Sequence, residues 1–508
     1  MSSAKQTDDR TVTRLALLTV VLAATLAAIP STAAAAPAVA TPDVVQAFRL
    51  DQPVQLDGKL DEAAWQQPGE TRLIQNDPEN GVPPRHPTEF WVAYDDEAFH
   101  LAARLHDTAP DSIAARLGRR DSWPASDWLF LNLDTFNDDR TGFSFSVNPA
   151  GVIGDSALYN DGWSDSSWDG VWQAATAIDD HGWTVELRIP FSQLKFPAAE
   201  EQVWGINVSR RTLRYNERDE LFHRPRGSAG YGRRFPDLVG IRGIEPPGVV
   251  EARAYGLLRS EHLEVDPDNP FQDTAQNSLD AGLDLKTALS NNLTLNATFN
   301  PDFGQVEVDP AVVNLSAYET YFPERRPFFV EDASVFRFGV EGTNSNWNFN
   351  WMEPLLFYSR RVGRAPQIAI DGDPDYSDVP GNTTILGAAK VSGKVGNTSV
   401  GAISAFTARE NAHLETAGER HDQVVEPFTN YSVVRARHAR PDGSQGLGVI
   451  ATGTVRALAA PVSQAAVDRR AFTAGVDGWT HLDDDGVWAL KGYLAASRVT
   501  GSPEAIDD

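Results

Sequence analysis

The chain has 508 residues, no cysteine and a formal net charge of −26. The lack of cysteine excludes disulfides, thiolate metal sites and a cysteine nucleophile. The negative charge argues against a nucleic-acid partner, because phosphate binding needs a concentrated basic surface. A chain of this length is expected to form two or three domains, each with its own core.

The first 36 residues have the organisation of a secretory signal peptide. Arg10 and Arg14 precede an apolar run over residues 15–29, and Pro30 and an alanine-rich stretch follow it. The run is shorter than the roughly 20 apolar residues that a membrane helix needs. We therefore expect an exported protein that is cleaved near Ala36.

Beyond residue 40 the sequence predicts strands almost everywhere. Short alternating runs rich in Val, Phe, Trp and Thr are separated by clusters of Asp, Asn, Gly and Pro. These runs are too short for membrane helices, so the mature chain could enter a membrane only as a closed barrel. The predicted fold class is all-β.

Residues 43–245 carry large aromatic side chains on their predicted strands, as in EFWVAYDDEAF, DWLFLNLDTF and GWTVELRIPF. Such strands suit an antiparallel β-sandwich with an aromatic core. Pro246 and Pro247 then end this part, because proline cannot continue a hydrogen-bonded ladder. The sequence predicts a second domain over residues 246–508.

Strands of the second domain alternate apolar and polar residues over about ten positions. The hairpin of residues 279–300 has one apolar and one polar face, and the pattern returns in residues 447–455 and 488–495. An outer-membrane barrel needs such strands. A soluble antiparallel sheet with one wet face shows the same period, so periodicity alone leaves both open.

Several motifs resemble known families. LDGKLDEAAW, DDEAFHLAARLHD, DTFNDDRTGFSFSVNPAGVIGDS and GWTVELRIPFSQL resemble successive strands of family 9 carbohydrate-binding modules. Residues 300–336 and FYSRRVGR resemble the domain of unknown function 5916 that follows this module in envelope proteins. The resemblance implies a β-sandwich followed by an antiparallel outer-membrane β-barrel, with the sandwich in the periplasm or at the cell surface.

The C-terminal stretch SPEAIDD departs from that pattern, because outer-membrane barrels usually finish on a strand with a terminal aromatic residue. Only about ten candidate strands can be counted in the second half, so an incomplete barrel and a truncated product are both expectations.

Sugar binding calls for an exposed aromatic platform with planar polar groups beside it. The loop YNDGWSDSSWDGVW offers Trp163 and Trp168 as platforms and Asp161 as a polar partner, whereas Trp172 is expected in the core. Arg120 is a candidate clamp for a sugar hydroxyl or a uronic carboxylate. An ordinary surface ion pair is the alternative for Arg120.

Three acidic residues, Asp134, Asp138 and Asp139, are weak candidates for a structural Ca²⁺ site, because hard carboxylate oxygens suit this ion. Turn formation without a metal is the alternative, since the spacing is not that of a defined calcium loop. No other cofactor is expected.

Catalysis has one weak candidate pair, Glu307 and Asp309, which share one side of an extended strand. We prefer an architectural interpretation, in which a short helix follows Pro310 and the next stretch lies inside the barrel or at its rim. That stretch would hold four residues in ion pairs: Glu324, Arg325, Arg326 and Glu331.

Two functions of different classes remain. The first is carbohydrate binding at the outer membrane, in polysaccharide capture or catabolism, with a poly- or oligosaccharide and membrane lipid as partners. The second is a glycoside hydrolase that acts on O-glycosyl bonds, which would cleave an oligosaccharide rather than only bind it. A structural envelope protein without a ligand is a weaker alternative.

Overall fold

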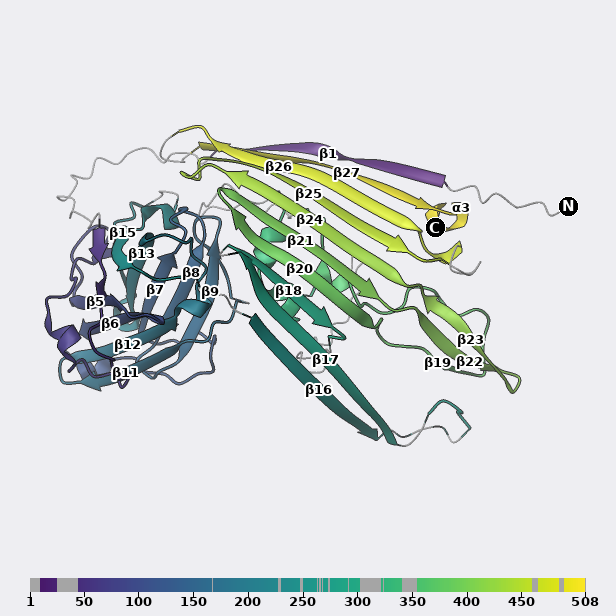
Figure 1. Cartoon of the computed structure of the whole chain (residues 1–508), viewed down its shortest axis with the longest axis horizontal. Coiled ribbons are helices and arrows are strands. Elements are labelled where there is room, and N and C mark those ends of the chain that lie inside the picture. The colour runs from purple at the N-terminus through teal and green to yellow at the C-terminus, as the bar shows by residue number, and fades with distance from the viewer. Residues whose placement is uncertain are drawn as a thin grey trace.

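The computed structural model describes residues 10–24, 44–166, 168–226, 230–246, 250–262, 264, 266, 268–272, 275–290, 292–301, 321–322, 324–339, 354–458, 465–483 and 488–507. Strands dominate these ranges and the helices are short, which confirms the predicted all-β class (Figure 1). A sandwich formed by the N-terminal half lies beside one end of a long sheet (Figure 1). Within the described ranges, no helix has the length and hydropathy to span a bilayer.

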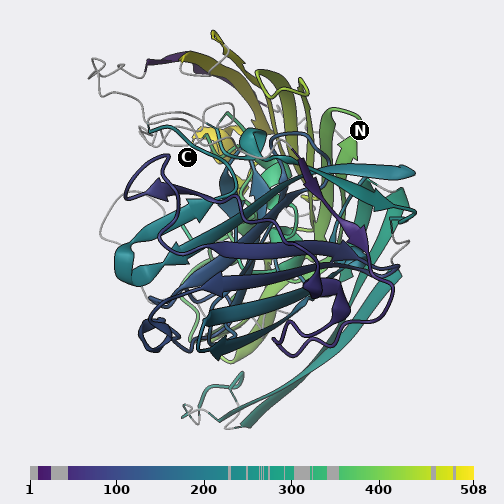
Figure 2. The same ribbon diagram turned by 90° about the vertical axis from the view of Figure 1, so that its left-hand side faces the viewer.

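Two sheets form the sandwich, which faces the viewer in Figure 2. The larger sheet has the order β10-β9-β8-β7-β13-β14-β4, and β15 joins β13 to β2. The smaller sheet has the order β11-β12-β6-β5-β3. The strands are β2 (Val44–Gln46), β3 (Phe48–Arg49), β4 (Ile74–Asp77), β5 (Thr88–Tyr94), β6 (Ala98–His106), β7 (Trp128–Asp134), β8 (Gly142–Val147), β9 (Ile153–Tyr159), β10 (Trp163–Asp165), β11 (Gln173–Asp179), β12 (Gly182–Pro190), β13 (Glu201–Thr212), β14 (Glu217–Glu220) and β15 (Asp237–Arg242).

Short 3-10 helices connect some of these strands: η1 (Ala63–Gln66), η2 (Pro110–Ser112), η3 (Phe191–Gln193), η4 (Leu213–Tyr215) and η5 (Gly232–Arg234). The sandwich core lies between the two sheets and includes Phe145, Trp183 and Trp204. Its buried cluster runs from Val45 to Ile244 in sequence and includes no residue of the long sheet. The sandwich therefore buries a core of its own.

The long sheet has ten strands in the order β1-β27-β26-β25-β24-β21-β20-β18-β17-β16, and neighbours pair antiparallel. Its edges in the described part of the chain are β1 and β16, so the sheet does not close there. The strands are β1 (Arg10–Ala24), β16 (Val250–His262), β17 (Ala275–Ser290), β18 (Leu293–Phe299), β20 (Ile385–Val395), β21 (Thr398–Thr407), β24 (Thr429–Ala439), β25 (Gln445–Arg456), β26 (Arg470–His481) and β27 (Trp488–Gly501). A small sheet of β19 (Tyr376–Asp378), β22 (Glu410–Thr416) and β23 (Glu419–Glu426) extends beyond one end, and α3 (Pro503–Asp507) follows β27.

Part of the expected signal peptide forms β1, which pairs with β27 from Arg10 opposite Gly501 to Ala24 opposite Trp488. The expected cleavage position near Ala36 lies outside the described residues. Export and cleavage therefore stay predictions.

The two faces of the long sheet are reversed relative to a soluble sheet. One face exposes large apolar side chains, among them Leu279, Phe406, Leu447, Val449, Phe472 and Leu494. The opposite face buries polar and charged side chains, among them Asn296, Thr298, Lys390, Ser392, Arg435 and Asp477. The apolar and polar faces predicted for residues 279–300 belong to this arrangement, since Thr294, Asn296 and Thr298 are buried while Phe299 is exposed.

Residues 324–339 and 354–364, called the inner segment below, cover part of the polar face. They contain α1 (Pro327–Val330), η6 (Ala333–Phe336) and η7 (Ser359–Arg361). Phe329 packs with Ile385 and Ala405, and Phe336 and Phe338 pack with Ile403, Val433 and Ile450. Gly401 permits this contact, because a Cβ there would lie 2.7 Å from the Phe336 ring.

Ion pairs of Glu324, Arg326 and Glu331, which were expected in this stretch, are present. Glu324 binds Arg326 at 2.7 Å, and Glu331 binds Lys286 of β17 at 2.7 Å. The backbone N–H of Arg325 donates to Glu324. The helix expected after Pro310 lies outside the described residues.

Candidate functional site

Arg120 lies in the loop between η2 and β7 and is bound by several acceptors of the sandwich. Its guanidinium contacts the buried carboxylate of Asp155, donates to the Gly170 carbonyl at 2.5 Å and pairs with Asp169 at 2.7 Å. Burial raises the pKa of Asp155. The arrangement fixes the chain around Gly170 against β9, so Arg120 has a structural role in addition to any contact with a ligand.

Three tryptophans that follow β9 in the chain differ in their surroundings. Trp172 is buried as expected, and its indole N–H donates to Asp155 at 2.8 Å. Trp168 is half-buried, with its ring 4.9 Å from that of Phe143. Trp163 is half-buried and makes an edge contact with Tyr159 at 5.8 Å. Trp163 and Trp168 thus use part of their ring surface inside the protein, and their role as sugar platforms stays a prediction.

Asp161 orders a neighbouring loop. It has a left-handed backbone (φ 57°), accepts the N–H of Tyr231 at 2.8 Å and that of Arg233 at 3.2 Å, and its pKa is raised by burial. These contacts hold the start of η5.

The predicted sugar-binding residues form two groups. Arg120 and Trp172 meet at Asp155 near the start of β9, whereas Trp163 contacts Tyr159 at its end. Four residues of extended chain separate those two positions by about 13 Å. The residues therefore do not converge on a single small site.

Trp123 is an aromatic platform that sequence reasoning missed. It lies in the loop before β7, and 53 % of its surface is exposed. Its ring is nearly parallel to that of Phe130 (12°, centroids 5.9 Å apart) and 5.0 Å from that of Trp128. Because these two rings pack against it, the indole is held in place without being buried.

Polar groups lie beside this platform. Asp121 is two residues before Trp123 in the chain, and a Cβ on Gly154 would lie 3.4 Å from the Asp121 Oδ1 and 3.5 Å from the Trp123 ring. Arg120 pairs with Asp121, and each of these two side chains is 33 % exposed. Asp121 accepts the N–H of Asp155 at 3.0 Å, while Arg120 is held by the carboxylates described above. A fixed indole beside a guanidinium and carboxylates can stack on a pyranose face and hydrogen-bond to its hydroxyls. The sequence signal was Trp-Pro in a loop next to the RRD cluster.

The three calcium candidates are engaged in a turn. Asp134 accepts the backbone N–H groups of Asp138 at 2.8 Å and Asp139 at 2.7 Å, and Asp138 accepts two donors of Thr141 and contacts Lys394. Burial, together with Asp138 and Asp161, raises the pKa of Asp139 to about 6. Among the described residues, no group of three His, Asp or Glu side chains is arranged to hold a metal. A Ca²⁺ ion at these aspartates stays a hypothesis.

The weak catalytic candidates Glu307 and Asp309 lie outside the described residues. A perturbed carboxyl does occur in the sandwich, since burial beside Glu217 raises the pKa of Asp219 to about 8. Only 1 % of Asp219 is exposed, which keeps it from a large substrate such as a polysaccharide.

The solved structures to which this chain is similar include carbohydrate-binding proteins and a FadL homologue. A family 9 carbohydrate-binding module from Caldicellulosiruptor kristjanssonii, in complex with glucose, is 16% identical, with 39% of this chain and 94% of the module covered and a TM-score of 0.28. A putative carbohydrate-binding protein from Bacteroides uniformis is 12% identical, with 39% and 99% covered and a TM-score of 0.31. A FadL homologue from Pseudomonas aeruginosa is 10% identical, with 74% and 88% covered and a TM-score of 0.19.

A search of curated proteins found no match. A family model matches part of the second half of the chain, and it is the one that the motifs after residue 300 predict. Residues 264–445 of this chain match the domain of unknown function DUF5916.

Proposed function

We propose that this protein binds a saccharide on its sandwich while its long sheet meets the lipid of a bacterial outer membrane. The observation that carries the saccharide part is Trp123, a rigidly supported and exposed indole with Arg120 and Asp121 beside it. The resemblance of the sandwich motifs to family 9 carbohydrate-binding modules supports the same ligand class. An exported protein of this kind would serve in polysaccharide capture or catabolism.

The membrane part rests on the reversed faces of the long sheet. Leu279, Leu447 and Phe472 stand on its exposed face, whereas Lys390, Arg435 and Asp477 are buried on the other. Exposing so many large apolar side chains to water is unfavourable, at about 25 cal/mol per Å². Strands such as β20, β24 and β25, of 11, 11 and 12 residues, are long enough to cross a bilayer when tilted. Lipid is the solvent that matches this face.

The saccharide part is tested by titrating the protein and its Trp123→Ala variant with sugars. Glucose and cellotriose, which the C. kristjanssonii modules bind, are the first probes, followed by a wider glycan panel. Loss of the platform should weaken binding by about 2 kcal/mol, or roughly thirtyfold in Kd. The melting temperature should hardly change, because the ring is half exposed.

Three further alanine variants serve as controls. Trp172→Ala should lower stability by roughly 3–5 kcal/mol, because a core cavity forms. Trp163→Ala and Trp168→Ala test whether the stretch after β9 contributes to binding of the same ligand. If Trp123→Ala binds every sugar as tightly as the parent, Trp123 is not the platform. If the parent binds no sugar, the saccharide function is wrong.

A further inference from the structure

The two ends of the long sheet carry connections of very different length. At one end the strands are joined through residues 291–292, 396–397, 440–444 and 482–487. At the other end the joining stretches are residues 263–274, 300–384, 408–428 and 457–469, and the second of these includes the inner segment. Because all neighbouring strands are antiparallel, each set belongs to a single end.

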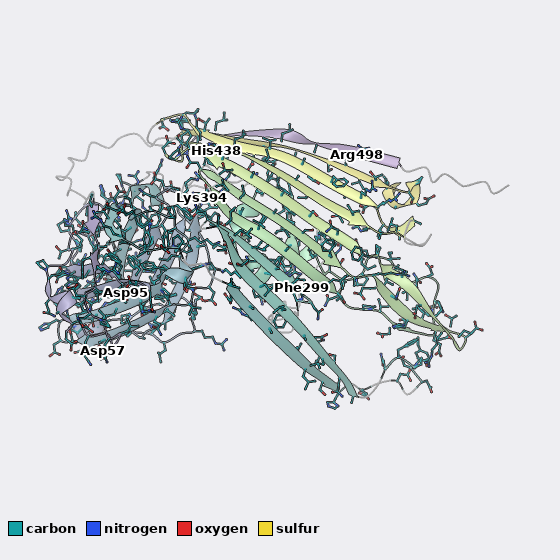
Figure 3. The ribbon with its side chains drawn as sticks, viewed as in Figure 1. Asp57, Asp95, Phe299, Lys394, His438 and Arg498 are labelled. Carbon is teal, nitrogen blue, oxygen red and sulfur yellow. The ribbon has the colours of Figure 1, made fainter. Side chains whose placement is uncertain are left out.

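The sandwich contacts the end with the short connections. Asp138 pairs with Lys394, which lies beside the connection 396–397 and is labelled in Figure 3. Arg140 donates to the Gly443 carbonyl in the connection 440–444 at 3.4 Å. Its guanidinium also lies 4.5 Å from the ring of Trp479 at the end of β26.

Two more observations agree with this seating. The chain leaves the sandwich and enters β16 at Val250, which pairs with Thr287 near the connection 291–292. Lys195 of the sandwich binds Asp332 of the inner segment at 2.8 Å, and Asp332 also accepts the Ser392 hydroxyl. The sandwich is therefore joined to the strands and to the segment that covers their polar face. The hairpin of β22 and β23 lies at the far end (Figure 1).

We infer that the sandwich lies on the periplasmic side of the outer membrane, seated on the short-turn end of the long sheet. In bacterial outer-membrane barrels the short turns face the periplasm and the long loops face the outside. This inference rests on the proposed membrane role of the long sheet and gives the saccharide a location. The ligand is an oligosaccharide present in the periplasm, and a polymer that stays outside the cell does not reach Trp123.

The chain has no cysteine, so single cysteines report the side of the membrane without background. Asp180→Cys places a thiol in the exposed turn between β11 and β12 of the sandwich, and Glu419→Cys places one at the exposed start of β23. Both changes remove one carboxylate. Intact cells that produce each full-length variant are treated with a membrane-impermeant maleimide, before and after permeabilisation of the outer membrane.

Glu419→Cys should label in intact cells, whereas Asp180→Cys should label only after permeabilisation and then as fully as Glu419→Cys. Labelling of Asp180→Cys in intact cells, or failure of Glu419→Cys to label there, would overturn the orientation. Fractionation of the same cells distinguishes a failure of the proposed membrane role from a failure of the proposed orientation. Recovery of the protein in the soluble fraction would refute the membrane role and the orientation together, while recovery in the outer membrane with reversed labelling would refute the orientation alone.

Discussion

At the scale of single residues, Asp219 should make the stability of the sandwich depend on pH. It lies on β14, opposite Arg210 of β13, and its Oδ1 has no hydrogen-bond partner among the described residues. Burial and the nearby Glu217 raise its pKa from 3.8 to about 8. In the folded protein the carboxyl is therefore neutral below about pH 8, whereas in the unfolded chain it is ionised above pH 3.8.

The sign of the pH effect follows from this difference. Folding takes up a proton at Asp219 between the two pKa values, so its contribution to stability is fully present below pH 3.8 and is lost as pH rises toward about 8. Asp219→Asn, whose side chain stays neutral, should have the same melting temperature as the parent near pH 3.8, the lower of these two values. At the upper value it should melt more than about 10 °C higher, because the two pKa values differ by an amount worth about 6 kcal/mol and a domain of about 200 residues gains about 2–4 °C per kcal/mol.

Thermal melts of the parent and Asp219→Asn across this pH range check the prediction. Asp180→Asn is the control, because it removes an exposed carboxyl from the same sandwich and should not alter the pH dependence. A constant difference between parent and Asp219→Asn at all pH values would show that the effect is packing and not proton uptake.

The candidate site could be predicted from sequence only in part. The aromatic composition of residues 43–245 indicates a sandwich with an aromatic core, and the expected burial of Trp172 in that core is confirmed. Which tryptophan stays exposed depends on which rings lie beneath it. Trp123 is exposed because Phe130 and Trp128 occupy the positions below it, and no local pattern encodes that stacking.

At the scale of elements, β25 provides a test of the reversed faces. Val449 stands on the exposed face of the long sheet, and Thr452 stands half-buried on the opposite face. Val449→Arg should impair membrane assembly, because a charge on the lipid face costs roughly 2–4 kcal/mol at mid-bilayer. Thr452→Arg, on the polar face, should assemble normally. Yields in the outer-membrane fraction measure both, and equal yields would favour a soluble sheet.

Alternation in the sequence predicts which residues share a face of the sheet, but it does not predict whether that face contacts lipid, water or another segment of the chain. Leu295→Arg on β18 should behave like Val449→Arg, yet its neighbour Asn296 is a poor control because it is buried on the polar face. The cover comes from the inner segment, which lies outside β18 in sequence. It contacts the neighbouring strand β20, where Lys390, opposite Asn296, donates to the carbonyls of Phe328 and Glu331. The alternation of apolar and polar residues along a strand does not show which positions a distant segment will bury.

At the scale of the whole molecule, polar and cation–π contacts join the sandwich to the long sheet and to the inner segment in the described part of the chain. Asp138, Arg140 and Lys195 contact Lys394, Gly443 and Asp332, respectively. The buried apolar cluster of the sandwich contains no residue of the long sheet. Pro246 and Pro247 predict the boundary between the two parts, and β15 and β16 lie on either side of it. The sequence pattern carries no information on these contacts, because they join residues that lie far apart along the chain.

Because its core is complete, a fragment of residues 43–245 should fold alone as a monomer with a single cooperative melt. The described interactions that the fragment lacks are polar or cation–π contacts, so exposure of Asp138, Arg140 and Lys195 to water should cost little stability. The fragment should also bind the same saccharide as the full-length protein, since Trp123 and Arg120 lie within it. Calorimetry and sugar titration of both proteins measure these quantities. Aggregation of the fragment, or a broad melt without a transition, would mean that the long sheet stabilises the sandwich, whereas a well-folded fragment with weaker sugar binding would mean that the contact with the long sheet shapes the site.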